Sequence, residues 1–209
     1  MNEFSITGTT SHSTTIYGLA NGTIYNYYIK CQDTVGNFNN DDFTITFRIA
    51  TAIINISNID DAYIRNDVPD TNHGGSSRFL IDGAPVIYRT LIKPLDLGGI
   101  PPNTTILKAE LVLTAYDLGS PANASKVLST WNENTVTWNT LPAIESMPFT
   151  TFRTNSTTVI VDITSLMQEW INSEPIYGVL LWSFRTDGSD YRSTEYSIVA
   201  QRPKIIVMI

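Results

Sequence analysis

Residues 107–116 read LKAELVLTAY, and apolar side chains recur at every second position of this stretch. One face carries Leu107, Ala109, Leu111, Leu113 and Ala115, and the other carries Lys108, Glu110, Thr114 and Tyr116. A period of two is typical of a β-strand with one buried face, because successive side chains point to opposite sides. The stretch therefore predicts a half-buried strand in an all-β domain.

Other short runs rich in β-branched and aromatic residues flank this strand, and clusters of turn residues separate them. We expect strands at Ala62–Arg65, Arg78–Ile81, Val86–Lys93, Thr135–Trp138, Thr157–Asp162, Val179–Phe184, Tyr196–Ala200 and Lys204–Ile209. About nine strands in about 155 residues are enough for a jelly-roll β-sandwich.

One short helix is predicted between these strands. Asp162 or Thr164 can cap its first amides, and Pro175 stands beyond its end. Its apolar residues follow a helical spacing: Leu166, Met167, Trp170 and Ile171. Because this spacing places them on one face, we expect Trp170 to anchor the helix in the core.

The N-terminal part of the chain reads as a second, smaller β unit. Its expected strands are Phe4–Thr7, Thr14–Tyr17, Thr23–Gln32 and Asp42–Ile49. The motifs Gly18-Leu19, Asn21 to Tyr25, Asp33 and Gly36-Asn37 resemble the second half of a fibronectin type III domain. The resemblance implies that the Tyr25 hydroxyl anchors a neighbouring loop.

This N-terminal unit is too small to form a complete β-sandwich. About 45 residues without a disulfide or a metal ion bury too little apolar surface. We therefore expect a partial fibronectin type III-like β-sandwich that is truncated or completed by another segment or chain. The predicted domains are residues 1–52 and 53–209, and no flexible linker separates them.

A series of motifs follows in order from Ile59 to Ile209. They are Asp60 to Ile64, Asn72 to Ser77, Arg89 to Leu97, Ile100 to Thr104, Lys108 to Leu111, Trp131 to Trp138, Val161 to Thr164, Tyr177 to Leu181, Arg192 to Glu195 and Arg202 to Lys204. This series resembles the DNRLRE domain family, which is related to carbohydrate-binding module family 96 and to repeats found beside archaeal disaggregatases. The chain departs from the family pattern at His73, where Tyr is common, and at Lys93, where Phe is frequent.

The resemblance implies a non-catalytic jelly-roll module appended to extracellular enzymes or surface proteins. Acidic polysaccharides such as alginate are among the ligands suggested for the family. We therefore expect an extracellular or cell-surface location and a polysaccharide or cell-surface glycan as partner.

Composition and charge exclude several classes of partner. The net charge is −7, and the 13 Lys plus Arg are spread singly, so no basic stripe could neutralise nucleic-acid phosphates. No apolar run approaches the roughly 18 residues of a membrane span, so we expect no membrane insertion. Cys31 is alone, which rules out an internal disulfide, and we expect it to be buried.

The sequence shows no recognisable catalytic constellation. His12 and His73 lie far apart and outside any zinc motif, and no Gly-x-Ser-x-Gly elbow or phosphate loop occurs. Carboxylates that could serve a glycosidase are available at Glu133, Asp162, Glu169, Asp187, Asp190 and Glu195. Nothing in the pattern brings two of them together as hydrolysis requires, so we predict that the chain is not an enzyme.

Aromatic and basic residues are the candidates for ligand contact, because sugars stack on aromatic faces and uronates pair with guanidinium groups. The predicted ligand-binding residues are Tyr191, Arg192, Arg185, Trp131 and Trp138. Further candidates are the aromatic residues Trp182 and Tyr116 and the basic residues Arg89 and Lys126. We expect Tyr191 and Arg192 to lie in a loop of Asp, Gly and Ser residues. Trp131 and Trp138 belong to a family motif and are expected to be partly structural.

No cofactor is expected to be required, but the opening motif offers oxygen ligands for a structural calcium ion. They come from Asp60, Asp61 and Asn72, and ordinary turn chemistry is the alternative explanation.

Two functions follow from these observations. The first is a non-catalytic extracellular module that binds a polysaccharide or matrix component. The alternative is a structural repeat of an extracellular filament, sheath or adhesin, in which neighbouring copies assemble by strand exchange.

Overall fold

The computed structural model describes residues 13–209. The chain divides into two compact units, one ending at Ala52 and the other spanning Ile53–Ile209. The expected strand at Phe4–Thr7 lies outside the described residues. Thr14–Tyr17 does not form a strand, so that prediction is wrong.

The first unit contains a β-hairpin of strands β1 (Ile24–Ile29) and β2 (Phe43–Arg48). Its register pairs Tyr25 with Phe47 and Tyr27 with Ile45, so one face of the hairpin is apolar. The Tyr25 hydroxyl accepts a hydrogen bond from the backbone amide of Ala20 at 2.7 Å, the contact that the resemblance implies. Cys31 is exposed, not buried as expected.

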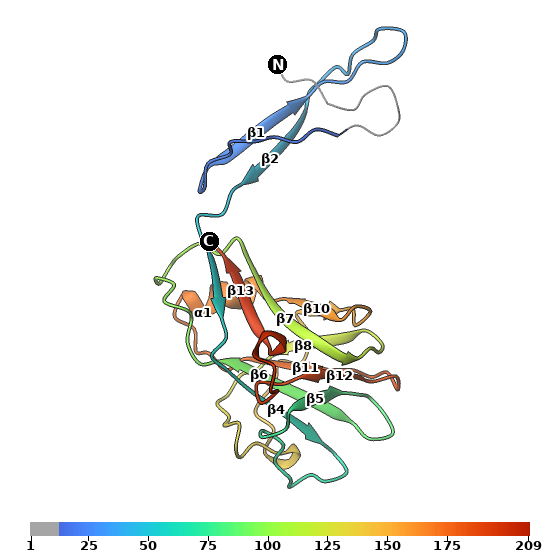
Figure 1. The fold of residues 1–209 in the computed structure, drawn as a ribbon, viewed down its shortest axis with the longest axis vertical. Coiled ribbons are helices and arrows are strands. Elements are labelled where there is room, and N and C mark those ends of the chain that lie inside the picture. The colour runs from blue at the N-terminus through green and yellow to red at the C-terminus, as the bar shows by residue number, and fades with distance from the viewer. Residues whose placement is uncertain (1–12) are drawn as a thin grey trace. The chain divides into compact units, whose positions relative to one another are not determined.

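The second unit consists of two antiparallel sheets and one short helix, and the all-β prediction is confirmed (Figure 1). The first sheet has the order β3 (Ile53–Ile56), β13 (Lys204–Met208), β7 (Lys108–Asp117), β12 (Ser189–Arg192) and β5 (Arg78–Ile81), with β10 (Thr158–Asp162) also paired to β7. The second has the order β4 (Ile59–Arg65), β6 (Tyr88–Pro94), β11 (Val179–Trp182), β8 (Ala122–Lys126) and β9 (Thr150–Phe152). The series β3-β13-β7-β10 and β6-β11-β8-β9 give the strand order of a jelly roll.

The alternating stretch that predicts the fold lies in β7. Ala109, Leu111 and Leu113 are fully buried between the sheets, because every second side chain points into the core. Helix α1 (Thr164–Ile171) is confirmed, and it buries Trp170 with the other three apolar residues of its predicted face. The backbone amide of Thr164 donates a hydrogen bond to Asp162.

Some local predictions differ from the structure. Thr135–Trp138 and Tyr196–Ala200 are not strands, and short 3-10 helices occupy Trp138–Thr140 and Val199–Gln201. Strands β3, β8, β9 and β12 were not predicted; they are short strands formed on neighbours distant in sequence. Their pairing partners, not their own periodicity, make them strands.

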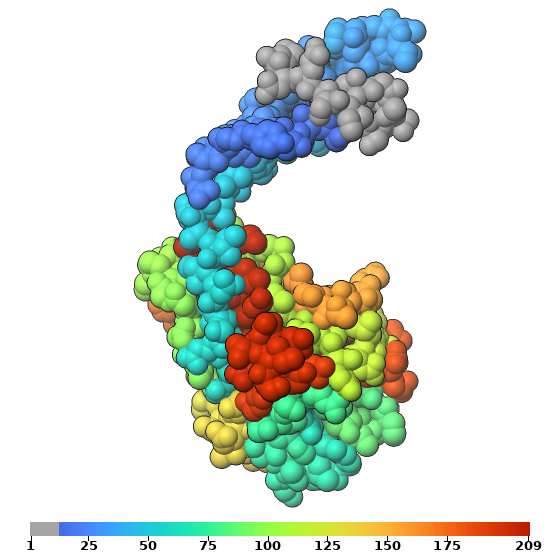
Figure 2. All heavy atoms as spheres, viewed as in Figure 1, coloured from blue at the N-terminus to red at the C-terminus, as the bar shows by residue number. Residues whose placement is uncertain are grey.

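The C-terminal segment lies against the segment around residue 75 on one face of the second unit (Figure 2). The Ser193 hydroxyl donates a hydrogen bond to the Ser76 carbonyl at 2.6 Å, and the Ser193 amide donates one to Ser77. These bonds bring Thr194 and Glu195 close to strand β4. Among residues 13–209, no helix has the length and apolar character needed to cross a bilayer.

Candidate functional site

The outer face of the second sheet carries a second, smaller hydrophobic core. Ile64 on β4, Leu91 on β6 and Leu180 on β11 point to this face and are buried. Residues 127–144 cover them, and a β-bridge between Val127 and Ile144 brings the two ends of this segment together. We call residues 127–146 the covering segment.

A pocket of about 360 Å³ lies between the covering segment and the sheet. This volume falls in the range of roughly 300–1,000 Å³ that small-molecule sites occupy. Its lining includes Arg89, Ser125, Leu141, Glu145, Trp182 and Phe184. Of the described residues that line it, Arg89 is the one base and Glu145 the one acid.

Trp182 and Phe184 form the aromatic wall of this pocket. Trp182 ends β11 on its outer face, and its indole Nε1 donates a hydrogen bond to the Ser125 hydroxyl at 3.0 Å. The Phe184 ring meets Trp182 edge to face, with centroids 4.5 Å apart, and is 79% exposed. The hydrogen bond fixes the indole, so the pair offers a rigid, accessible apolar surface.

Arg89 supplies a cation at the same pocket. Its side chain leaves the outer face of β6, and its guanidinium lies 5.1 Å from the centroid of the Trp138 ring. Burial lowers the pKa of Arg89. Within residues 13–209 the guanidinium has no ion pair or hydrogen bond, so its N–H donors remain available to a ligand.

A group of contacts next to the pocket joins the opening motif to the Trp131–Trp138 motif. The Asn72 side-chain amide donates hydrogen bonds to the carbonyls of Glu133 and Val136, both at 2.7 Å. Gly74 packs so closely that a Cβ there would overlap the Glu133 carbonyl group. We call Asp61, Asn72, Gly74, Trp131 and Glu133 the clamp.

Trp131 is the buried anchor of the clamp. Only 7% of its surface is exposed, and its indole Nε1 donates a hydrogen bond to the Tyr177 carbonyl at 2.8 Å. The ammonium group of Lys93 lies 4.6 Å from the Trp131 ring centroid and pairs with Asp60 at 3.2 Å. The ring therefore packs against the protein and does not offer a free face.

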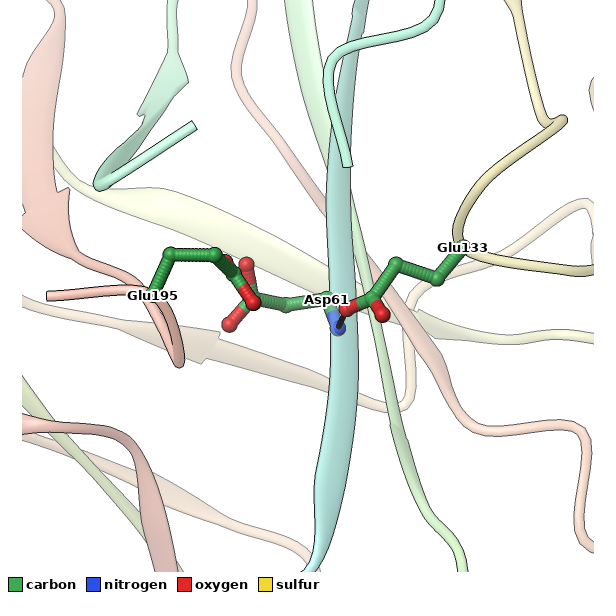
Figure 3. A group of neighbouring side chains, drawn as sticks. All are labelled: Asp61, Glu133 and Glu195. Carbon is green, nitrogen blue, oxygen red and sulfur yellow. Dashed lines mark hydrogen bonds between the residues drawn. The ribbon is translucent and has the colours of Figure 1, made fainter. Parts of the chain in front are cut away.

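Three carboxylates meet at the clamp: Asp61, Glu133 and Glu195 can place one oxygen each within 4.8 Å of the others. Figure 3 shows Asp61 between the two glutamates. Asp61 is 2% exposed, its backbone amide donates to Glu133, and its carboxylate accepts from the Thr194 amide at 2.7 Å. These oxygens are hard ligands of the kind that calcium prefers.

Burial, more than the mutual repulsion of the carboxylates, shifts the pKa values at the clamp. Burial, and after it the charges of Glu195 and Glu133, raises the pKa of Asp61 to about 8, although the hydrogen bond from Thr194 opposes the shift. Burial also raises the pKa of Glu133. A neutral Asp61 or a bound cation would relieve the repulsion between these groups.

The model of carbohydrate-binding module family 96 matches residues 52–208. The chain belongs to carbohydrate-binding module family 96. Comparison with curated proteins gave no match. Modules of such families are typically non-catalytic, and they are commonly extracellular.

The family 96 module places the predicted ligand residues in different environments. Trp138 is half-buried and lies beside the pocket through its contact with Arg89, whereas Trp131 is inside the clamp. Arg185 is exposed and directly follows Phe184. Its backbone carbonyl accepts a hydrogen bond from Gly83, but its side chain is not part of the pocket lining.

Tyr191 and Arg192 are in strand β12 and not in the expected loop. Tyr191 is fully buried with its ring 5.4 Å from that of Phe79, and burial raises its pKa to about 12. In this structure Tyr191 therefore has no exposed surface to offer a ligand, in contrast to the expected loop position. Arg192 points to the opposite, outer face of this sheet.

The module does not bring Asp60, Asp61 and Asn72 together as one ligand set. Asp60 and Asp61 are neighbours on β4 and point to opposite faces, and Asp60 pairs with Lys93. Both polar ends of the Asn72 side-chain amide bind backbone groups, because its nitrogen donates to the Glu133 carbonyl and its oxygen accepts from the Gly74 amide. Asp61 instead meets Glu133 and Glu195, two acids that no sequence pattern had linked to it.

The aromatic wall was missed in part. Trp182 was one of several aromatic candidates in the sequence, but Phe184 was assigned only to the end of a strand. Its place in a pocket depends on the covering segment, which packs nearby from a distant part of the chain. The one local signal is that Trp182 continues the outward alternation of Leu180 in β11.

Proposed function

We propose that this family 96 module is a non-catalytic, extracellular or cell-surface module that binds a polysaccharide in the pocket of the second sheet. The observation that carries the proposal is the unpaired Arg89 guanidinium in the same pocket as the half-buried Trp182 and the exposed Phe184. A sugar ring has an apolar C–H face and a rim of hydroxyl groups, so it needs both features in one site.

The polar groups of the pocket suit a sugar rim. Arg89 donates hydrogen bonds, Glu145 accepts them, and both lie at the lining. One base and one acid give the pocket no strong net charge, which favours recognition of hydroxyl groups over that of a single charged substituent. The apolar floor comes from Leu141 and Leu180.

The arrangement of acids supports binding without hydrolysis. Glycosidases place two carboxylates on either side of the scissile bond, whereas Glu145 is the one acid of the pocket lining. Asp61, Glu133 and Glu195 are assembled at the clamp, where Asp61 is buried. Catalysis, where the parent protein has it, then belongs to another part of that protein.

The test is a polysaccharide array with the intact chain, including neutral and uronate polymers, followed by titration calorimetry on the best hit. We expect Trp182→Ala, Phe184→Ala and Arg89→Gln each to weaken binding about tenfold or more, since each removes a direct ligand contact. Leu95→Ala is the matched control, because it removes a half-exposed apolar side chain outside the pocket. Equal losses in all four variants, or no polysaccharide bound below millimolar concentration, would overturn the proposal.

A second candidate function is assembly with neighbouring copies through the N-terminal strands. The apolar face of the β1–β2 hairpin favours it, since Phe43 is 67% and Ile45 is 40% exposed. A two-stranded hairpin is marginally stable alone and gains from further strands. Light scattering and electron microscopy test the idea: a monodisperse monomer counts against it, and filaments that Phe43→Ser abolishes support it.

A further inference from the structure

The outer face of the first sheet carries two arginines on neighbouring strands. Arg78 on β5 and Arg192 on β12 are direct register partners. Phe79 and Tyr191, the residues next to them, are fully buried, so the two arginines point outward. Like charges directly opposite each other in a sheet repel, so this pair requires compensation from its surroundings.

Two tyrosines provide part of that compensation. The Arg192 guanidinium lies 4.3 Å from the ring centroid of Tyr116 and 4.2 Å from that of Tyr196. The Arg78 guanidinium lies 4.5 Å from the same Tyr116 ring. We call Arg78, Tyr116, Arg192 and Tyr196 the arginine–tyrosine stack. The rings hold both guanidinium planes in fixed orientations.

The carboxylates around the stack neutralise only one of its two cations directly. Asp190 pairs with Arg78 at 2.8 Å, and its charge also acts on Arg192. Asp117 is the register partner of Asp190 and is exposed. Within residues 13–209, Arg192 makes no ion pair or hydrogen bond, and its buried Nε has no partner. Its terminal N–H groups are therefore free to bind an anion.

We propose that the arginine–tyrosine stack is a second glycan-binding site, which takes the sulfate ester of a sulfated polysaccharide. A sulfate ester presents three oxygens that can accept hydrogen bonds from Arg192 and Arg78 together. A carboxylate has only two oxygens, which lie in one plane, and Asp190 already bonds to Arg78 through one of its own, while its other oxygen is buried without a partner. The site lies on the opposite sheet from the pocket, so one module can hold two glycan segments.

The experiment compares dextran sulfate with unsulfated dextran of the same length, using the intact chain in calorimetry at physiological salt. We expect dextran sulfate to bind and dextran not to bind at the stack. Arg192→Gln and Arg78→Gln should each weaken dextran sulfate binding about tenfold or more, and Arg192→Lys about threefold, because lysine keeps the charge without the planar donors.

Arg65→Gln is the matched control. Arg65 also lies over a tyrosine, 5.0 Å from the ring of Tyr88, but it is paired with Asp67. Arg65→Gln changes the net charge of the protein by the same amount as Arg192→Gln, so it controls for long-range electrostatics. Because Arg65 is already paired with Asp67, we expect dextran sulfate binding to this variant to stay within about twofold of the wild type. Trp182→Ala should also leave dextran sulfate binding intact, which separates a failure here from a failure of the pocket.

Three results would overturn the proposal: no binding of dextran sulfate by the wild type, an equal loss in Arg65→Gln, or equal affinity for polygalacturonate. If Arg192→Gln lowers the melting temperature below the assay range, Arg192→Lys and Arg78→Gln still decide the outcome. A stack that only stabilises the fold would lower the melting temperature in these variants and leave dextran sulfate affinity unchanged.

Discussion

Trp131, the anchor of the clamp, and the pocket lie on the same outer side of the second sheet, but one is buried and the other is open. Trp131 in the clamp is 7% exposed and donates its indole hydrogen bond to a backbone carbonyl. Phe184 in the pocket is 79% exposed and contacts Trp182 edge to face, and the Trp182 indole donates its hydrogen bond to the Ser125 hydroxyl. The clamp residues of the Trp131–Trp138 motif hold the fold, whereas Arg89, Trp182 and Phe184 of the pocket lie outside that motif.

This contrast explains why the family can be recognised without its ligand. The clamp joins three distant segments through backbone contacts, so its residue types are restricted by geometry. The pocket has an apolar wall and a few polar groups, and many residue types could line such a surface. Substitutions in the two regions should therefore separate stability from binding.

The largest expected effect is the loss of the clamp anchor. Trp131→Ala should lower the free energy of unfolding of the second unit by about 3–5 kcal/mol, because it leaves a cavity and an unpaired Tyr177 carbonyl. All four tryptophans lie in the second unit, so their fluorescence in a denaturant titration reports on that unit alone. Trp182→Ala should lower this free energy less and affect polysaccharide binding more. Equal losses of stability would remove the distinction between the two regions.

Asn72→Ala should have the next largest effect on stability. The variant leaves two partly buried carbonyls without their donor, which costs about 1–3 kcal/mol in the free energy of unfolding. Asn139→Ala is the matched control, because the Asn139 amide bonds only to the exposed side chain of Asp70. The control should change the same free energy by less than about 0.5 kcal/mol. A loss in the control as large as that of Asn72→Ala would show that the clamp has no special role.

The fold could be predicted from the sequence where one segment carries its own pattern. Residues 107–116 and the apolar face of α1 do so, and both are confirmed. Strand β8 (ANASK) and strand β12 (SDYR) have no such pattern, and they become strands because β11, β5 and β7 pair with them. Their assignment requires knowledge of contacts distant in sequence.

The candidate sites also divide into features that a local pattern predicts and features that depend on contacts distant in sequence. The alternation rule alone could have separated Asp60 from Asp61, since adjacent residues in a strand point to opposite faces. It could not have placed Glu195 beside Asp61, because the bond between Ser193 and Ser76 brings those segments together. Likewise, the position of the covering segment over Trp182 depends on its packing, and no local motif encodes it.

A dependence of stability on pH is expected from Asp61. Its pKa in the folded protein is about 8, well above the ordinary value of 3.8. The folded state therefore favours the protonated acid, and its contribution is complete below about pH 4 and is lost as the pH rises toward 8. In chelator, the free energy of unfolding should fall over this window by at most about 1.4 kcal/mol per pH unit.

Asp61→Asn provides the control for this pH dependence, because the amide oxygen still accepts the hydrogen bond from Thr194. The variant should lose most of the slope between pH 4 and 8. Asp96 and Asp162 have lowered pKa values, so they act with the opposite sign and mainly below about pH 4. An unchanged slope in Asp61→Asn would show that this carboxyl does not control the stability of the clamp.

The smallest expected effect is stabilisation of the clamp by calcium through Asp61, Glu133 and Glu195. At about five times its dissociation constant, a bound ion would add about 1 kcal/mol to the free energy of unfolding. A cation binds the charged carboxylate, so calcium should raise the melting temperature of the second unit at pH 8 and have little effect at pH 5. Asp61→Asn should abolish the increase, whereas the pocket variant Phe184→Ala should retain it. Equal melting temperatures in calcium and chelator at pH 8 would mean that protonation of Asp61 alone relieves the repulsion, and that the clamp binds no calcium.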